Sequence, residues 1–453
     1  MQVYRARNPK KSLLWQCAQR HYDEFEQIYP AAYQPRYGLL RSIIPEVVHK
    51  FMACGNLERG FARVRCDHCQ HEYLQAFSCK SRWFCPSCHQ KNVQTTARFI
   101  LEQVVAPVPH RHYVLALPKM LRPYFQRHRP LLKQLCTLAH QSLTEYLRTA
   151  LNCPAGVPGI ILTLHTFGEY LDFHPHVHAL VADGLFARSP AESPGCQGAD
   201  APTRDFQPRP DAPLQALEEL FRAKVIHLLV EQKLLAPERV QILYSWKHSG
   251  FNVHAGQSVP PEAKADLEKL AQYILRNPFS VEKMTMEFPA DTIIYRSRLN
   301  AKINRNFEVF SATDFLAAIT QHIPDKGAQM VRYYGWYSNK TRGVRQRGRP
   351  AALVVRRPGL SPPPPVRLPS KRWRDLILRV WHVDPLRCPV CQHPMRVLAL
   401  IDDRRVVEKI LRHLGAWHDP PVALTPPGSA GGYTREPCTD VDPMPDYENV
   451  LTD

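Results

Sequence analysis

Long apolar runs are missing from the sequence: no stretch of about 18 uncharged residues is apolar enough to span a membrane. The basic N-terminal segment MQVYRARNPKKSLLWQ also lacks the apolar core and the small-residue cleavage site of a secretory signal. Both absences argue against a membrane protein and against secretion. We therefore expect a cytoplasmic protein that does not act at a membrane.

Acidic residues are scarce relative to basic ones, with 41 Asp and Glu against 59 Lys and Arg and a formal net charge of +18. Such an imbalance indicates a polyanionic partner, either nucleic acid or an anionic membrane surface. Since nothing else points to a membrane, nucleic acid is the starting hypothesis. Residues 340–374 contain SPPPP and no acidic residue, and we expect them to form an extended basic linker that binds the DNA backbone.

Disulfide bonds are not expected, because the thirteen cysteines are an odd number in a chain without a secretory signal. Six of them form C-x-x-C pairs, a spacing that suits two thiolate ligands on one metal ion. These pairs are Cys66/Cys69, Cys85/Cys88 and Cys388/Cys391.

The first two pairs are separated by only fifteen residues and predict one tetrahedral, structural zinc site. Its four expected ligands are Cys66, Cys69, Cys85 and Cys88. Cys79 lies between the pairs and is the reserve ligand, whereas three nearby histidines are less well placed (His68, His71 and His89). The alternative is a group of small buried thiols. The third pair has no partner pair nearby in the sequence, so we expect an ordinary tight turn there, and a second zinc ion is the alternative.

Three histidines alternate along the stretch FHPHVHAL: His174, His176 and His178. In a β-strand they share one face, because side chains two residues apart point the same way. The intervening valine and alanine residues then point into a core. His174 precedes Pro175 at the start of the strand, so we expect it to matter less. The alternative is a polar surface strand that binds no ligand.

A hairpin with the preceding segment, GIILTLHTFGEYL, brings a further histidine to the same face. If His165 pairs with His176 across the turn, both imidazoles face one metal ion, and Glu169 and Asp172 are alternative oxygen donors in or near the turn. A site of this kind with open coordination positions suits a Mg²⁺ or Mn²⁺ ion that polarises a phosphate group. We expect this face of the strand to be open to solvent and DNA.

Metal-assisted phosphoryl transfer also needs an attacking group, and tyrosine hydroxyls are the candidates. In the expected helix KADLEKLAQYILRNP, Tyr273 lies about 130° from the centre of the apolar stripe, on the flank or the polar side. The alternative is a half-buried tyrosine that anchors the helix. The rivals Tyr333 and Tyr337, in RYYGWYSNK, flank Gly335 and suit a strand or turn packed on the core.

Several long motifs, in the same order, resemble those of the Insertion Sequence 91 family of transposases, within the superfamily of His-hydrophobe-His single-strand endonucleases. They are GFARVRCDHC…SCKSRWFCPSC, HRHYVLALPKMLR, LHTFGEYLDFHPHVHALVADG, LAQYILRNPFS and FLAAITQHIPDKGAQMVRYYGWYSNK. The resemblance spans most of residues 35–415. It implies an α+β fold with a central antiparallel sheet and flanking helices, and an N-terminal zinc-binding domain.

The resemblance also implies roles for individual residues. The metal-binding pair of the family falls on His176 and His178, with His165 as the candidate third ligand, and the nucleophile falls on Tyr273. The family's two-tyrosine pattern requires another tyrosine at position 269, where this chain has Lys269. The chain therefore resembles the single-tyrosine branch.

The implied activity is rolling-circle DNA transposition, in which the enzyme nicks and rejoins single-stranded DNA through a 5′-phosphotyrosine intermediate. Mg²⁺ or Mn²⁺ would serve catalysis and Zn²⁺ would serve structure. The partners would be single-stranded DNA at the transposon ends and target, and other copies of the chain in a homo-oligomer, in the cytoplasm of a bacterium. Two alternatives stay open: a plasmid replication initiator or relaxase with the same chemistry, and a non-catalytic zinc-dependent DNA-binding regulator.

The expected organisation along the chain has six parts. They are a helical region (1–60), a zinc-binding domain (61–95), the catalytic domain (96–340) with a loop insertion (187–213), a basic proline-rich linker (341–370), a small C-terminal unit (371–415) and a disordered tail (416–453).

Overall fold

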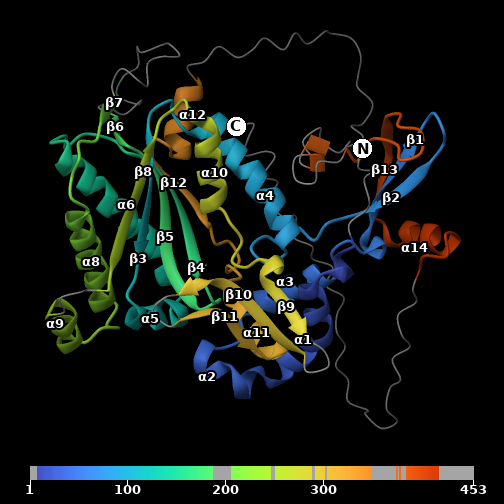
Figure 1. Cartoon of the computed structure of the whole chain (residues 1–453), viewed down its shortest axis with the longest axis horizontal. Helices are drawn as coiled ribbons and strands as arrows, with labels where there is room; N and C mark the ends of the chain where they lie inside the picture. The colour runs from blue at the N-terminus through green and yellow to red at the C-terminus, as the bar shows by residue number, and fades with distance from the viewer. Residues whose placement is uncertain are drawn as a thin grey trace.

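The computed structural model describes residues 8–186, 206–245, 250–287, 291–300, 304–347, 374–375, 377–378 and 384–417. Within these ranges, no helix is both long and apolar enough to cross a membrane. The fold is α+β, as predicted: antiparallel sheets are packed against helices (Figure 1).

A five-stranded antiparallel sheet forms the centre of the molecule, in the order β12-β4-β5-β3-β8. Its strands are β3 (His110–Ala116), β4 (Gly159–Phe167), β5 (Phe173–Ala182), β8 (Asn252–Val259) and β12 (Val331–Gly335). β4 and β5 are rich in aliphatic residues and are buried along nearly their whole length, which is typical of strands covered on both faces. The strands predicted for GIILTLHTFGEYL and FHPHVHAL are thus confirmed.

Helices cover both faces of the central sheet (Figure 1). One face packs against α6 (Pro130–Ala150) and α8 (Leu214–Glu231), and the other against α4 (Pro86–Phe99), its π-helical extension Ile100–Val104 and α10 (Lys264–Ile274). Neighbouring residues of β5 enter different cores, because side chains alternate along a strand. Val177, Ala179 and Val181 therefore lie beneath α6 and α8, as predicted, while the histidines face α10.

The expectation of an open histidine face is wrong. His176 is 7 % exposed, His178 2 % and His165 0 %. The reason is the docking of α10, whose apolar stripe of Leu267, Ala271 and Ile274 is buried against the same side of the sheet. Sequence periodicity identified this stripe but not the surface that it covers.

The N-terminal helices pack against a segment that is distant from them in the sequence. α1 (Leu13–Ala32) and α3 (Ile43–Met52) share a core with α11 (Ala312–Thr320). A small antiparallel sheet completes this core, formed by β9 (Met284–Glu287), β10 (Thr292–Asn300) and β11 (Arg305–Phe310). The helices expected in residues 1–60 are present, but they are joined to the part of the chain that we assigned to catalysis.

A third sheet, in the order β13-β1-β2, lies to one side of the central sheet (Figure 1). It consists of β1 (Phe61–Cys66), β2 (Glu72–Ala76) and β13 (Met395–Ile401), and α14 (Arg404–His413) packs on Phe61 through Val407 and Leu411. β13 and α14 belong to the expected C-terminal unit. This unit is therefore not separate, because its strand completes the sheet of the cysteine-rich segment.

Other segments refine the expected boundaries. β6 (Gly184–Phe186) pairs with β7 (Phe206–Pro208), so the insertion is shorter than expected at its C-terminal end, and residues 187–205 lie outside the described residues. α12 (Asn339–Arg347) covers the start of the expected basic linker, while residues 348–373 and the tail from 418 also lie outside. The remaining helices are Pro9–Lys11, α2 (Gln34–Tyr37), Leu57–Arg59, Lys119–Leu121, α5 (Arg122–Arg127), α9 (Pro237–Ser245) and Val281–Lys283.

Buried histidines make the fold sensitive to acid. Burial lowers the pKa of His110 to about 4 and that of His322 to about 3, so both imidazoles are neutral in the folded protein. In the unfolded chain they take up a proton near pH 6.5. Their contribution to stability is therefore complete above pH 6.5 and is lost progressively as the pH falls below it.

We expect the free energy of unfolding to fall between pH 6.5 and 4.5 by on the order of 1–2 kcal/mol for each of these two histidines. Urea denaturation at a series of pH values measures the slope, and His322→Gln should flatten it. Burial alone would raise the pKa of Asp183, but the ion pair with Arg111 holds this pKa below its usual value. Protonation of this carboxylate therefore affects the free energy of unfolding only at lower pH. A stability that stays constant over this window would contradict the expectation.

Candidate active site and cysteine clusters

The two central strands bring three histidines together on the face below α10. The register of β4 and β5 places His165 directly opposite His176, as predicted for the hairpin, and His178 is next on the same face. One ring nitrogen from each of the three lies within 4.8 Å of the other two. The Nε2 atoms of His176 and His178 are 3.1 Å apart.

Backbone carbonyls orient two of these rings. His165 Nε2 donates to the carbonyl of Ile274 at 2.8 Å, which leaves His165 Nδ1 buried and without a hydrogen-bond partner among the described residues. His176 Nδ1 donates to the carbonyl of His174 at 2.8 Å, which leaves its Nε2 without a proton, as an acceptor that faces His178 Nε2. His178 Nδ1 shares a hydrogen bond of 2.8 Å with His112 Nε2 on β3. Fixing the far nitrogen of a histidine in this way is typical of metal ligands.

The cluster is uncharged in the folded protein. Burial lowers the pKa of His176 to about 3, and it lowers the pKa of His165 and His178 as well, assisted by the neighbouring imidazoles. Neutral imidazole is the form that binds a metal ion. The cluster contains neither of the oxygen donors left open by the sequence, Glu169 and Asp172, and Asp172 instead pairs with Arg122 at 3.2 Å. The three imidazoles thus leave further coordination positions for other ligands.

Tyr273 lies at the edge of the histidine cluster, near the end of α10. Its ring is 5.6 Å from that of His178 and 5.9 Å from that of His112, centroid to centroid, and the residue is 45 % exposed. Tyr273 therefore lies on the flank of the helix, as predicted. The end of α10 is held on both sides, because the carbonyl of Ile274 accepts from His165 and that of Leu275 bonds to His89 Nε2 at 2.7 Å.

Arg276 is a residue that the sequence reasoning missed. Its guanidinium carbon lies 4.4 Å from the ring centroid of Tyr273 and 5.5 Å from that of Phe167, and its Nε is buried without a hydrogen-bond partner among the described residues. An arginine held between two rings with donors to spare suits a phosphate group. The only sequence indication was its position three residues after Tyr273. His112 was also missed, although it alternates with His110 at the start of β3.

The rival tyrosines occupy different environments. Tyr337 is fully buried, and its hydroxyl bonds to His110 Nε2 at 2.7 Å. Tyr333 packs against Phe99 and lies beneath the guanidinium of Arg342. Neither ring is among those that contact the histidine cluster in the described part of the chain.

The expected grouping of four cysteines on one zinc ion needs correction. The structure places Cys85 and Cys88, at the start of α4, with Cys54 and Cys79, and their four sulfur atoms lie within 4.8 Å of one another. Cys79, the reserve ligand, thus belongs to this group. Cys54 was missed because it is an isolated cysteine after α3 and is not part of a C-x-x-C pair.

Cys66 and Cys69 form a second group, with Cys388 and Cys391. The expectation that Cys388 and Cys391 form a turn without partners is therefore wrong. The pairing of β1 with β13 brings the two C-x-x-C turns together, although they are far apart in the sequence. None of the three nearby histidines belongs to either group of four cysteines. His89 bonds to the carbonyl of Leu275, and the carbonyl of His71 accepts a hydrogen bond from the N–H of Cys66. His68 stacks on His393, and the ligand atoms of these two histidines and of Cys391 lie within 4.8 Å of one another.

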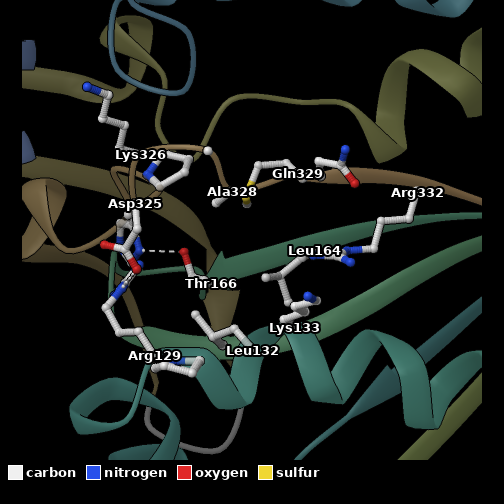
Figure 2. A pocket seen from close by; sticks show the side chains of 15 residues that line it. Arg129, Leu132, Lys133, Leu164, Thr166, Asp325, Lys326, Ala328, Gln329 and Arg332 are labelled. Carbon is white, nitrogen blue, oxygen red and sulfur yellow. Dashed lines mark hydrogen bonds and ion pairs between the residues drawn. The ribbon is translucent and has the colours of Figure 1, made fainter.

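A separate pocket lies on the opposite face of β4 (Figure 2). Leu164 and Thr166 line it, and these side chains point away from the face that carries His165. Its charged lining is mainly basic, with one carboxylate, Asp325, that pairs with Arg129 at 3.1 Å. The basic residues are Arg129, Lys133, Lys326 and Arg332. The pocket is therefore not part of the histidine and tyrosine site.

Comparison with known proteins gives two family models that match different parts of the chain. One, described as "Putative transposase", matches residues 159–345, which include the histidine cluster and Tyr273. The other, described as "Transposase zinc-binding domain", matches residues 18–117, which include the whole group around Cys54 but only one pair of the second group.

Two curated relatives cover most of the chain. A transposase for insertion sequence element IS801 from Pseudomonas savastanoi pv. phaseolicola is 28% identical over 377 residues, which are 80% of this chain and 85% of the relative. A protein described as "Putative transposase y4qJ" from Sinorhizobium fredii is 22% identical over 396 residues, 83% of this chain and 94% of the relative. No solved structure gives a significant match.

Proposed function

Because the chain belongs to the Insertion Sequence 91 family of transposases, we propose that it nicks and rejoins single strands of DNA through a covalent bond to Tyr273. One observation carries this proposal: a half-exposed tyrosine stands beside three buried, neutral imidazoles whose ring nitrogens converge. A tyrosine that only anchored its helix would not need this neighbourhood. The proposed substrates are single-stranded transposon ends and a target strand.

In the proposed reaction the Tyr273 hydroxyl oxygen attacks the phosphorus of the scissile phosphodiester. A bond forms between this oxygen and phosphorus, and the bond between phosphorus and the 3′ oxygen breaks. The phenolic proton passes to solvent, and the leaving 3′ oxygen takes a proton to become a free hydroxyl. Because one phosphoester replaces another, the 5′-phosphotyrosine retains the energy needed for rejoining, and attack by a 3′-hydroxyl reverses the reaction.

The histidine cluster fits a divalent cation. His165 Nδ1 and His176 Nε2 have no proton, because the other nitrogen of each ring donates to a carbonyl, and His178 Nε2 lies beside them. Mg²⁺ or Mn²⁺ bound there would polarise the phosphate and offset the charge that develops on its oxygens. Arg276 is placed to bind the same phosphate next to Tyr273. His165 also donates a hydrogen bond to the carbonyl of Ile274. This bond fixes the position of α10, and with it Tyr273, relative to the histidine cluster.

The helix α10 carries a single tyrosine, Tyr273. Lys269, one turn before Tyr273, has a side chain that is 78% exposed and pairs with Asp266 at 3.1 Å. A complete transposition cycle needs more than one strand cleavage. We propose that Tyr273 is used again after each rejoining, or that a second copy of the chain supplies its own Tyr273.

The group formed by Cys54, Cys79, Cys85 and Cys88 fits a structural zinc ion. Four thiolates complete a tetrahedron and leave no position for substrate. Cys85 caps the N-terminus of α4 and Cys88 lies in its first turn, next to His89, which bonds to the end of α10. We propose that this zinc fixes α4 and, through His89, the position of the tyrosine helix.

Incubation of the full chain with single-stranded DNA and Mn²⁺ tests the proposed function. We expect a covalent protein–DNA adduct on a denaturing gel, and mass spectrometry should find a peptide modified at Tyr273. The released DNA product should carry a 3′-hydroxyl, which a polymerase can extend. Duplex DNA is the control and should give little adduct. Binding without any nicking would favour a zinc-dependent regulator, and an adduct at another residue would contradict the assignment of Tyr273.

A further inference from the structure

We propose that Cys66, Cys69, Cys388 and Cys391 form a second zinc site. This site links the C-terminal segment that the structure describes, residues 384–417, to the hairpin of β1 and β2. The match to the zinc-binding family model ends at residue 117 and includes only half of these ligands. The site is independent of the chemistry proposed for Tyr273. The turn at residues 66–71 is the first knuckle, and the turn at residues 388–393 is the second knuckle.

The two knuckles are near copies in sequence and in backbone geometry. Their sequences are CDHCQH and CPVCQH. In each, the first cysteine N–H donates to the carbonyl of the last histidine, at 2.8 Å in the first knuckle and 2.9 Å in the second. In each, the glutamine N–H donates to the carbonyl of the first cysteine at 3.0 Å. The chain thus builds the same turn twice and places the two turns face to face.

Both knuckles keep a glutamine in a strained conformation. Gln70 has a φ of 60° and Gln392 a φ of 61°, a left-handed region that a residue with a side chain rarely adopts. Such strain persists only where the surrounding structure requires it. The same strain occurs at the same position of both turns, which indicates that both turns must hold one particular geometry. A metal ion bound by the two cysteines of each turn requires such a geometry.

Backbone donors surround the sulfur atoms. The N–H groups of His68 and Cys69 point to Cys66 Sγ, and those of Val390 and Cys391 point to Cys388 Sγ. The second cysteine of each knuckle accepts in the same way, from His71 in the first and His393 in the second. The donors come from matching positions of the two knuckles, so the sulfur atoms of both turns are surrounded in the same way.

The distances between the knuckles suit a metal ion rather than a disulfide. Cys66 Sγ is 3.5 Å from Cys391 Sγ, and Cys69 Sγ is 3.4 Å from Cys388 Sγ. A disulfide bond is about 2.05 Å long. Four sulfur atoms at about 2.3 Å from a tetrahedral zinc ion are roughly 3.8 Å apart. The four atoms therefore need only a small outward shift to hold zinc.

The apolar cores that join the two chain segments are small. Their buried members are Val64, Cys66, Cys388 and Met395 around the knuckles, and Phe61, Val407 and Leu411 beneath α14. β13 pairs with β1 after more than 300 intervening residues, and closing such a loop costs entropy. Because the site forms only in the folded chain, the free energy of zinc binding adds to the free energy of folding and offsets this cost. Metal binding thus explains why so small a unit joins the hairpin.

Metal analysis of the full chain tests the proposal. We expect about two zinc ions per chain in the wild type, one in the double variant Cys388→Ser and Cys391→Ser, and an unchanged content in the control Cys153→Ser. Cys153 is half-buried and lies outside both cysteine groups. The deciding quantity is the difference between the double variant and the wild type. Equal zinc contents would overturn the second site.

Two further variants guard against misfolding and against confusion with the proposed nuclease function. Cys388→His retains a zinc-binding side chain and should restore the lost ion. Tyr273→Phe should retain both ions, whether or not it cleaves DNA. A protease site inserted between residues 350 and 370 lets the full chain be cut after purification. The fragments should elute together with zinc and separate in the double variant, and fragments that stay together in the double variant would overturn the fastening role.

Discussion

Replacing Tyr273 with phenylalanine should abolish the covalent protein–DNA adduct and slow strand cleavage by at least about a thousandfold. The substitution removes the attacking oxygen and leaves the ring, which supplies the contacts to His178, His112 and Arg276. Since the side chain is half exposed, the free energy of unfolding should change by less than about 1 kcal/mol. Quantified adduct formation on single-stranded DNA, together with urea denaturation, measures both effects.

Tyr244 offers a matched control for this experiment. It is 46% exposed, and the guanidinium carbon of Arg222 lies 5.0 Å from its ring centroid, much as Arg276 lies over Tyr273. Tyr244→Phe should therefore cleave like the wild type. If the adduct persists in Tyr273→Phe and is lost in Tyr337→Phe, the nucleophile has been assigned to the wrong tyrosine, although Tyr337 is fully buried.

Replacing His176 with asparagine should raise the Mn²⁺ concentration needed for half-maximal cleavage by at least about 100-fold. Changes to residues that only orient a metal ligand typically cost 10–100-fold in affinity, so the loss of a ligand should cost no less. His178→Asn should behave alike. Titration of Mn²⁺ into Tyr273→Phe, with and without His176→Asn, measures binding directly when cleavage is absent.

The control for the histidine series lies on the other side of the sheet. His140 of α6 stacks on Tyr334 with ring centroids 4.3 Å apart, and its pKa is lowered by burial to about 4. His140→Asn therefore removes a largely buried, neutral imidazole without touching the cluster, and its metal dependence should stay unchanged. If His176→Asn and His178→Asn leave the metal dependence unchanged too, the cation binds elsewhere. His165→Asn should have an additional effect, because it also frees the carbonyl of Ile274.

The histidine hairpin was predictable from sequence because its determinants are local. Alternation along a strand selects the residues on one face, and a short turn brings His165 opposite His176. The burial of that face was not predictable in this way. It depends on where α10 docks, and the apolar stripe of a helix does not name the surface that it covers.

The cysteines show the same limit more sharply. Each C-x-x-C pair correctly identified a turn that presents two thiols, because the spacing is a property of the turn itself. Which turn meets which is decided by strand pairing across the chain, and proximity in sequence suggested the wrong partners. Cys54 carried no local pattern at all, and it joins its group only because α3 ends beside the start of α4.

The pairing of β1 with β13 also has a consequence for biosynthesis. At elongation rates of about 5–20 residues per second, the ribosome needs roughly 15–65 s to reach the second knuckle after it has made the first. During that interval β1 has only β2 as a neighbour in its sheet. By the end of the interval every residue of the histidine cluster and Tyr273 has been synthesised. A nascent chain therefore exposes two unpaired thiols until its synthesis is nearly complete, and zinc supply late in translation becomes a condition for closing the fold.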